Sequence, residues 1–191
     1  MDKSHTDNPG DKNKVSLEIN RLAAISSTPN GQIFCGDIDM RIARDGTWYY
    51  HGSPIERKQL VKLFGSVLSR DDKGDYWLIT PVEKCRIKVD DAPFLAVEMT
   101  IAGNEKNQRL SFRTNVDDIV IAGAEHPLRI VTDTATGEPS PYILIREGIE
   151  ALIARSVFYD LVEIGSEFTS DGEASIGVWS DGVFFKLGNV D

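Results

Sequence analysis

The chain has 191 residues, of which 41% are hydrophobic and 27% are charged, and its formal net charge is -9 at pH 7. These are the values of an ordinary globular protein that is long enough to bury a real core. The negative charge argues against non-specific nucleic-acid binding and against adsorption to anionic membranes, because both rely on a basic surface. We therefore expect neither nucleic acid nor a membrane as a partner.

The cysteines and the chain start add little chemistry of their own. Cys35 and Cys85 lack the spacing of a zinc motif, and the three histidines are scattered, so the sequence predicts no metal site. No apolar run approaches the roughly 18 residues of a membrane span, and residues 1–14 do not have the pattern of a signal peptide. These features predict a cytoplasmic protein with reduced cysteines.

The first part of the chain changes character near residue 15. Residues 1–14 show no apolar periodicity and are expected to form a disordered tail. Val15, Ile19 and Leu22 then recur at helical spacing, and the Thr-Pro-Asn-Gly run at 28–31 ends the pattern. One short amphipathic helix is predicted here.

A hairpin and a helix are predicted next. Strand-forming residues 40–43 and 48–51 flank an Asp-Gly pair, which is the strongest short-range hairpin signal. Ser53 and Glu56 have the spacing of a capping box around Pro54. The apolar stripe that follows predicts a helix near 55–68 packed on a sheet.

The most distinctive stretch of the sequence is 75–83. Residues 76–79 are strand formers, and Pro81 ends the strand because it has no amide to donate. The resulting bend presents Thr80 and Glu83 beside two aromatic rings, which suits a ligand, although a capped strand end explains the same residues. The segments that follow predict an antiparallel meander, with Glu98 on a semi-apolar strand face.

The second half of the sequence repeats the first. Residues 128–131 match 40–43, residues 142–145 match 48–51, and the apolar residues at 157–162 match those at 63–68, which predicts a second helix near 149–162. Chance similarity of two amphipathic units is the alternative. We predict an α+β fold of duplicated hairpin-helix-hairpin units on mostly antiparallel sheets, with an N-terminal half at 15–98 and a C-terminal half at 99–191 packed together.

Ten short motifs together resemble the bacterial domain-of-unknown-function family twelve eighty-five. They occupy residues 36–42, 45–48, 52–55, 76–83, 91–94, 114–115, 126–129, 141–142, 177–179 and 182–185. The resemblance covers roughly residues 33 to 188. It implies a duplicated α+β architecture, a C-terminal half loosely like a pleckstrin-homology fold, a cleft between the halves for a nucleotide-like ligand, and a signalling role. It assigns no catalytic residue.

The candidate ligand-binding residues centre on two arginines. Arg41 and Arg129 occupy matching positions in the two copies, and a guanidinium fork fits phosphate oxygens, so the pair would hold an anion if both faced one cleft. Thr80 and Glu83 would contact the sugar or base, and Trp77 would stack on it. Structural ion pairing, with Arg41 bonded to Asp39, and packing of the tryptophan are the alternatives.

His51, at the end of a predicted hairpin strand, and Glu98 complete the candidate set. We expect a ligand-binding module with a signalling role, which takes a small anionic, nucleotide-like ligand between its halves and needs no cofactor. An uncharacterised hydrolase that uses Glu83 and Glu98 for acid and base chemistry is one alternative. A scaffold that binds another protein through an exposed apolar patch is the other.

Overall fold

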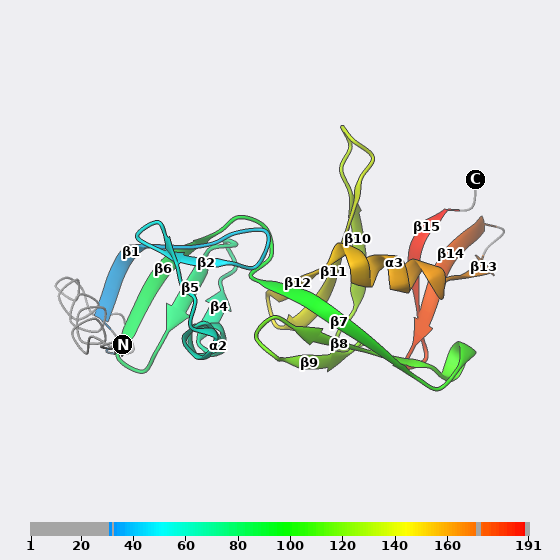
Figure 1. Cartoon of the computed structure of the whole chain (residues 1–191), viewed down its shortest axis with the longest axis horizontal. Coiled ribbons are helices and arrows are strands. Elements are labelled where there is room, and N and C mark those ends of the chain that lie inside the picture. Colours follow the sequence, from blue (N-terminus) through cyan, green and yellow to red (C-terminus); the bar gives the residue numbers. More distant parts are fainter. Residues whose placement is uncertain (1–30, 32, 171–172, 190–191) are drawn as a thin grey trace, which may run out of the picture.

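The computed structural model describes residue 31, residues 33–170 and residues 173–189. Figure 1 shows that these residues form three sheets arranged in a row, with the first sheet at the N-terminal end and the third at the C-terminal end. The disordered tail predicted at 1–14 and the helix predicted from residue 15 lie outside the described residues. Within the described ranges, no helix is long and apolar enough to cross a membrane.

The first sheet has six strands in the order β3-β2-β1-β6-β5-β4. Its central neighbours β1 and β6 run parallel, and its other pairs are antiparallel. The helix α2 lies between the third and fourth strands in the sequence. The elements are β1 (Ile33–Ile42), β2 (Trp48–Tyr50), β3 (Ser53–Pro54), α2 (Lys58–Ser66), β4 (Leu68–Arg70), β5 (Tyr76–Ile79) and β6 (Glu83–Val89).

The second sheet also has six strands, in the order β10-β11-β12-β7-β8-β9. Again one central pair, β12 with β7, is parallel and the rest are antiparallel. A short 3-10 helix, η1 (Glu105–Asn107), joins two of its strands. The strands are β7 (Phe94–Ala102), β8 (Arg109–Thr114), β9 (Ile119–Ile121), β10 (Leu128–Thr132), β11 (Pro139–Arg146) and β12 (Ile149–Ile153).

The last elements form a small sheet beyond the second one. The helix α3 (Arg155–Glu163) follows β12 directly, and three antiparallel strands follow it. These are β13 (Ser166–Ser170), β14 (Glu173–Ser180) and β15 (Val183–Asn189). Figure 1 shows them at the end of the molecule far from the first sheet.

The succession of three strands, a helix and three strands occurs twice, at 33–89 and at 128–189. We call these stretches the first unit and the second unit. Together with the two similar six-stranded sheets, this succession supports the predicted duplication. Cross-strand register places Arg41 opposite Tyr49 and Arg129 opposite Tyr142. The sequence match of 48–51 with 142–145 is therefore shifted by one residue in space.

Both predicted helices begin later in the structure than the sequence indicated. Ser53 and Pro54 pair with β2 as strand β3, and the helix starts at Lys58 with no side-chain cap on Arg57. The predicted capping box was wrong because the backbone there bonds to a neighbouring strand instead. In the second unit, Ile149–Ile153 is a strand between β11 and β7, and only Arg155–Glu163 is helical.

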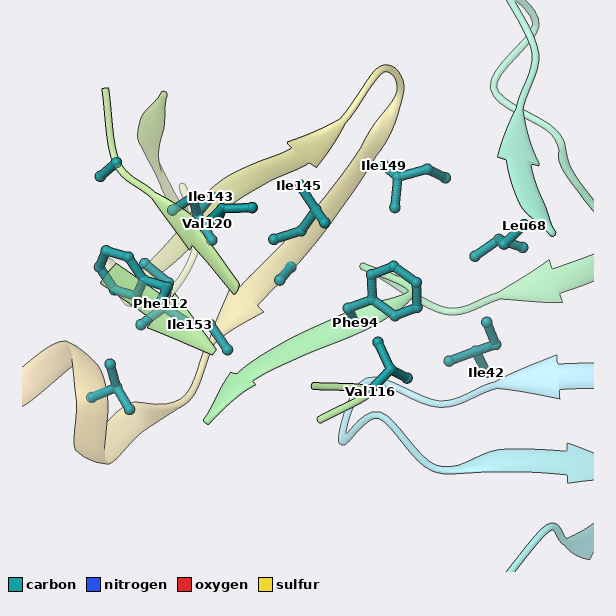
Figure 2. Close-up of a cluster of buried hydrophobic side chains, with 14 of the residues drawn as sticks. Ile42, Leu68, Phe94, Phe112, Val116, Val120, Ile143, Ile145, Ile149 and Ile153 are labelled. Atoms are coloured by element: carbon teal, nitrogen blue, oxygen red, sulfur yellow. The ribbon is translucent and has the colours of Figure 1, made fainter. Parts of the chain in front are cut away.

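One hydrophobic cluster runs through all three sheets. Ile42 and Leu68 come from the first unit, and Phe94, Val116 and Ile149 come from the chain after it, as Figure 2 shows. Polar bonds cross the same junction: the Tyr142 hydroxyl donates to Asp91 at 2.8 Å, and the Arg146 guanidinium donates to the Leu68 carbonyl at 3.2 Å. The boundary predicted between residues 98 and 99 falls inside the single strand β7.

Candidate functional site

A cavity of about 510 Å³ lies between the first hairpin of the chain and the second unit. The turn between β1 and β2 provides part of its wall, and β7, β11, β12, α3 and the residues directly before β11 and α3 provide the rest. Most of the wall is apolar. The lining residues are Arg44, Asp45, Leu95, Leu152, Ile153, Ala154, Arg155, Phe158, Tyr159 and residues 138–141.

The hairpin turn that reaches the cavity is held by one bond within the turn and by one bond to the second sheet. The Thr47 amide donates to the Asp45 carboxylate at 2.9 Å, and this bond lowers the pKa of Asp45 below its usual value. Gly46 has a φ of +80°, which suits glycine, and its carbonyl accepts a bond of 3.2 Å from the side chain of Asn115. The asparagine belongs to the turn after β8, so the hairpin tip is tied to the second sheet.

Arg44 is the first of two guanidinium groups at the cavity. Its Nε lies 3.2 Å from the Asp91 carboxylate, and its terminal nitrogen donates to the Ser140 hydroxyl at 2.8 Å. The side chain is still 62% exposed. The guanidinium is therefore held in place by two contacts and keeps donors that can reach a ligand.

Arg155, in the first turn of α3, is the second guanidinium. Its Nε donates to the hydroxyl of Tyr159, one helical turn away, at 2.6 Å, and this bond raises the pKa of Arg155. Glu138 is 4.0 Å away, and the arginine side chain is 77% exposed. Such an open pair contributes little to stability, so Arg155 can bind an anion at low cost.

The predicted arginine pair lies elsewhere. Arg41 donates to the Asp90 carboxylate at 2.7 Å, and Arg129 makes two bonds of 2.6 Å to Glu150. Each guanidinium also lies over the tyrosine opposite it, at 5.1 Å for Tyr49 and 4.3 Å for Tyr142. Neither arginine lines the cavity. The structure thus shows the ion pairing that was named as the alternative, but Arg41 pairs with Asp90 and not with Asp39.

The stretch around Trp77 is packed rather than open. The indole nitrogen donates to Asp71 at 2.9 Å, the Lys84 ammonium lies 4.3 Å from the ring centre, and the residue is buried. The Thr80 hydroxyl accepts a 3.0 Å bond from the Glu83 amide, which caps the strand end as the alternative interpretation held. Trp77, Thr80 and Glu83 are absent from the cavity wall.

His51 and Glu98 also lie outside the cavity. The His51 ring nitrogen is 3.2 Å from the Asp39 carboxylate, in the exposed bend after β2. A register shift in β7 between Ala96 and Glu98 exposes Glu98, and Arg113 on β8 donates to it at 2.6 Å. Glu83 and Glu98 belong to different sheets, so the structure does not assemble the acid and base pair of the hydrolase alternative.

Sequence reasoning missed Arg44 and Arg155. A signal existed for each: Arg44 precedes the Asp-Gly turn, and Arg155 has a tyrosine four residues later, at the spacing of one helical turn. What the sequence lacked was the contact between the hairpin tip and α3. The exposed large apolar side chains of the described residues lie on α2, the bend after β5, β7, β9, β10 and α3, and the scaffold alternative stays a prediction.

Two family models match consecutive parts of the chain. Residues 30–92 match the DUF1285 N-terminal domain, a domain of unknown function, and residues 93–187 match the C-terminal domain of the same proteins of unknown function. The chain belongs to the DUF1285 family. The resemblance found in the sequence is thereby confirmed, and the two matched regions meet just before β7.

Two solved structures of DUF1285 proteins are similar to this chain. A protein from Silicibacter pomeroyi DSS-3 is 48% identical, with a TM-score of 0.77, over 89% of this chain and 93% of that one. A protein from Shewanella baltica OS155 is 29% identical, with a TM-score of 0.53, over 66% of this chain and 91% of that one. A search of curated proteins found no match. The comparisons therefore show the family and leave its activity open.

Proposed function

We propose that this DUF1285 protein is a binding module for a small anionic, nucleotide-like ligand in the cavity between the first hairpin and α3. The observation that carries the proposal is that two exposed guanidinium groups, Arg44 and Arg155, line one mostly apolar cavity. A volume of about 510 Å³ is within the range of small-molecule sites. The proposal keeps the predicted ligand class and moves its anchor from Arg41 and Arg129.

The chemistry of the wall supports a ligand with two different ends. Guanidinium groups match phosphate oxygens in charge and in planar geometry. Phe158 and Tyr159 offer aromatic surface for a ring, and Asp45 and Glu138 offer acceptors for amino or hydroxyl groups. A nucleotide carries all three kinds of group, whereas inorganic phosphate uses only the first.

The ligand would couple two parts of the chain. Arg44 belongs to the first unit, and Arg155 belongs to the second, so an anion bound to both would add an attraction between the units. A ligand that favours one relative position of the units shifts their equilibrium towards it. This coupling is the basis for the signalling role that we include in the proposal. We also keep in the proposal the loose pleckstrin-homology likeness that was predicted for the C-terminal half.

The test is a thermal-shift screen of nucleotides, other phosphorylated compounds and inorganic phosphate at low ionic strength, followed by calorimetry on any hit. We expect Arg155→Gln and Arg44→Gln to weaken binding at least about tenfold each, which corresponds to about 1.4 kcal/mol. Arg41→Gln and Arg129→Gln remove the same charge outside the cavity and should change the affinity less than about threefold.

Three results would overturn the proposal. One is a screen without any stabilising compound, and another is equal weakening by all four substitutions, which would indicate only net charge. The third is weakening by the Arg41 and Arg129 variants alone, which would return the ligand to the position first predicted. Arg155→Gln is the decisive variant because its side chain is 77% exposed and its loss should leave the fold intact.

A further inference from the structure

Three potential metal ligands meet at the seam between β1 and β6. They are the Cys35 thiol, the Glu83 carboxylate and the Cys85 thiol, and one ligand atom from each lies within 4.8 Å of the other two. Cys85 is buried, and Cys35 and Glu83 are half-buried. The cluster therefore has a dry side towards the core and an accessible side at the end of the sheet.

The parallel pairing of β1 with β6 creates this cluster. Ile33 lies opposite Glu83, and Gly36 lies opposite Cys85, with a register shift between Phe34 and Gly36. Cys35 is the additional residue at this shift. An irregularity of this kind redirects a side chain. The Cys35 side chain therefore reaches the same seam as Glu83 and Cys85, which lie far from it in the sequence.

The backbone around Glu83 is fixed on both sides. The Thr80 amide donates to the Glu83 carbonyl at 2.8 Å, and the Ile33 amide donates to the Val82 carbonyl at 2.7 Å. These bonds join the bend after β5 to the start of β1. A backbone that is already ordered loses little further entropy when its side chains bind an ion.

The charges around the cluster are those of a cation site. Within residues 33–170 and 173–189, no Lys, Arg or His forms an ion pair with Glu83, whereas Asp37 on the same strand as Cys35 is paired with Arg86. The neighbouring Lys84 is engaged elsewhere, with its ammonium 4.3 Å from the centre of the Trp77 ring. The carboxylate beside the two thiols is therefore not neutralised by a described side chain.

We propose that Cys35, Glu83 and Cys85 form a binding site for a thiophilic divalent cation of the Zn²⁺ class. Two sulfur ligands and one carboxylate oxygen are a donor set that Zn²⁺ accepts, and water would complete a tetrahedral shell on the accessible side. On binding, the two sulfurs and the carboxylate oxygen replace water ligands of the aqueous ion, one water stays bound, and the thiol protons pass to solvent without any redox change. The site is separate from the proposed ligand cavity and does not depend on it.

This inference opposes the expectation of the sequence, which predicted no metal. Metal-binding motifs are recognised by short spacings between ligands. Here the ligands come from the first and last strands of a unit, and only the closure of its sheet brings them together. The rival state for two adjacent thiols is a disulfide, which would remove both sulfur ligands.

The test uses the full chain, reduced and stripped of metal with a chelator. Titration with Co²⁺ should give the thiolate charge-transfer and visible bands of a tetrahedral site at one ion per chain, and Zn²⁺ should abolish them. We expect Cys35→Ser and Glu83→Gln to weaken binding at least about tenfold, which is the lower end of the losses known for groups supporting a metal site. Glu98→Gln is the matched carboxylate control and should leave the affinity unchanged.

The accessibility of the thiols provides a second measurement. Bound Zn²⁺ should slow alkylation of Cys35 at least about tenfold, because the thiolate is held by the metal. The proposal is overturned if Co²⁺ gives no thiolate bands, if Cys35→Ser binds as tightly as the parent chain, or if a Cys35 to Cys85 disulfide forms at the same rate with and without saturating Zn²⁺. Circular dichroism of each variant distinguishes loss of the site from loss of the fold.

Discussion

The two units have the same succession of elements, but they differ in whether the last strand of the unit pairs with its first strand. In the first unit, β6 returns to pair with β1, so all six strands form one sheet. In the second unit, β15 lies near β10 but forms no ladder with it among the described residues, and β13, β14 and β15 form a sheet of their own. The strand β7, from outside the second unit, pairs with β12 instead.

The length of the third strand accounts for part of this difference. In the first unit that strand is β3, with 2 residues, and it ends the sheet as an edge. In the second unit it is β12, with 5 residues that alternate between buried and half-buried. A longer apolar strand offers a free ladder edge, and β7 pairs with it. A repeated pattern of elements thus does not determine which strands pair.

The two kinds of closure give two kinds of candidate site. The closed first unit brings its first and last strands together, and the cluster of Cys35, Glu83 and Cys85 lies at that seam. In the second unit, β12 and α3 face the hairpin tip of the first unit, and the cavity with Arg44 and Arg155 lies there. The first site therefore depends on a strand ladder between β1 and β6 that has no equivalent between the described strands β10 and β15, and the second depends on the docking of the hairpin tip.

The largest expected effect comes from the residue that joins the units. Phe94 is buried, its ring lies beside Gly65 of α2, and Arg146 lies 5.5 Å from its centre. Phe94→Ala should reduce the free energy of unfolding by about 3 to 5 kcal/mol, because it leaves a cavity in the core. Urea denaturation measures the loss. Ile101→Ala on the same strand is the control, because Ile101 is 47% exposed.

If Phe94→Ala reduced the free energy of unfolding by less than about 1 kcal/mol, the two units would not share a core. They would then not be parts of one cooperative structure. The parent chain supplies a second criterion. We expect fluorescence and circular dichroism to report one common unfolding transition, since the hydrophobic cluster is continuous.

A smaller effect is expected in the separate sheet of the second unit. A Cβ added at Gly177 would lie 2.4 Å from the Phe185 carbonyl and 2.4 Å from the Phe184 ring, so the backbone must move. Gly177→Ala should cost about 1 to 3 kcal/mol. At Gly188 an added Cβ meets nothing within 4 Å, so Gly188→Ala is the matched control. Equal stability of the two variants would show that β14 and β15 do not pack as the structure has them.

The smallest effect concerns the polar contact between the halves. Lys62 and Lys58 of α2 both bond to Asp117 in the turn after β8, and these bonds lower the pKa of Asp117. The contribution to stability is therefore present above the unfolded pKa of about 4 and is lost as the pH falls below it. Asp117→Asn should lower the urea midpoint at pH 7, and the difference from the parent chain should shrink in acid.

Asparagine suits this test because Asp117 has a φ of 67°, which asparagine tolerates better than most residues. The control is Glu56→Gln, at an exposed carboxylate with no ion pair to another described side chain. A difference between Asp117→Asn and the parent chain that stays constant from pH 7 to pH 3 would mean that charge at this position does not stabilise the junction.

Local chemistry determined much of the secondary structure. The hairpin around Asp45 and Gly46, the strand at 76–79 and the core of each helix follow from turn residues and apolar periodicity, which act within a few neighbours. The succession of elements in the two units was readable for the same reason. The start of each helix was not, because Ser53 and Ile149 lie in strands whose ladder partners only the tertiary structure provides.

Tertiary structure also decided both candidate sites. The sequence predicted an anion site at Arg41 and Arg129, but these arginines pair with Asp90, in the bend after β6, and with Glu150 on β12. Arg44 and Arg155 line one cavity only because the hairpin tip docks on the second sheet, and Cys35 lies close to Cys85 only because β1 pairs with β6. Sequence patterns report the preferences of neighbouring residues, whereas these sites depend on which distant strands pair, and that is set by burial in the shared core.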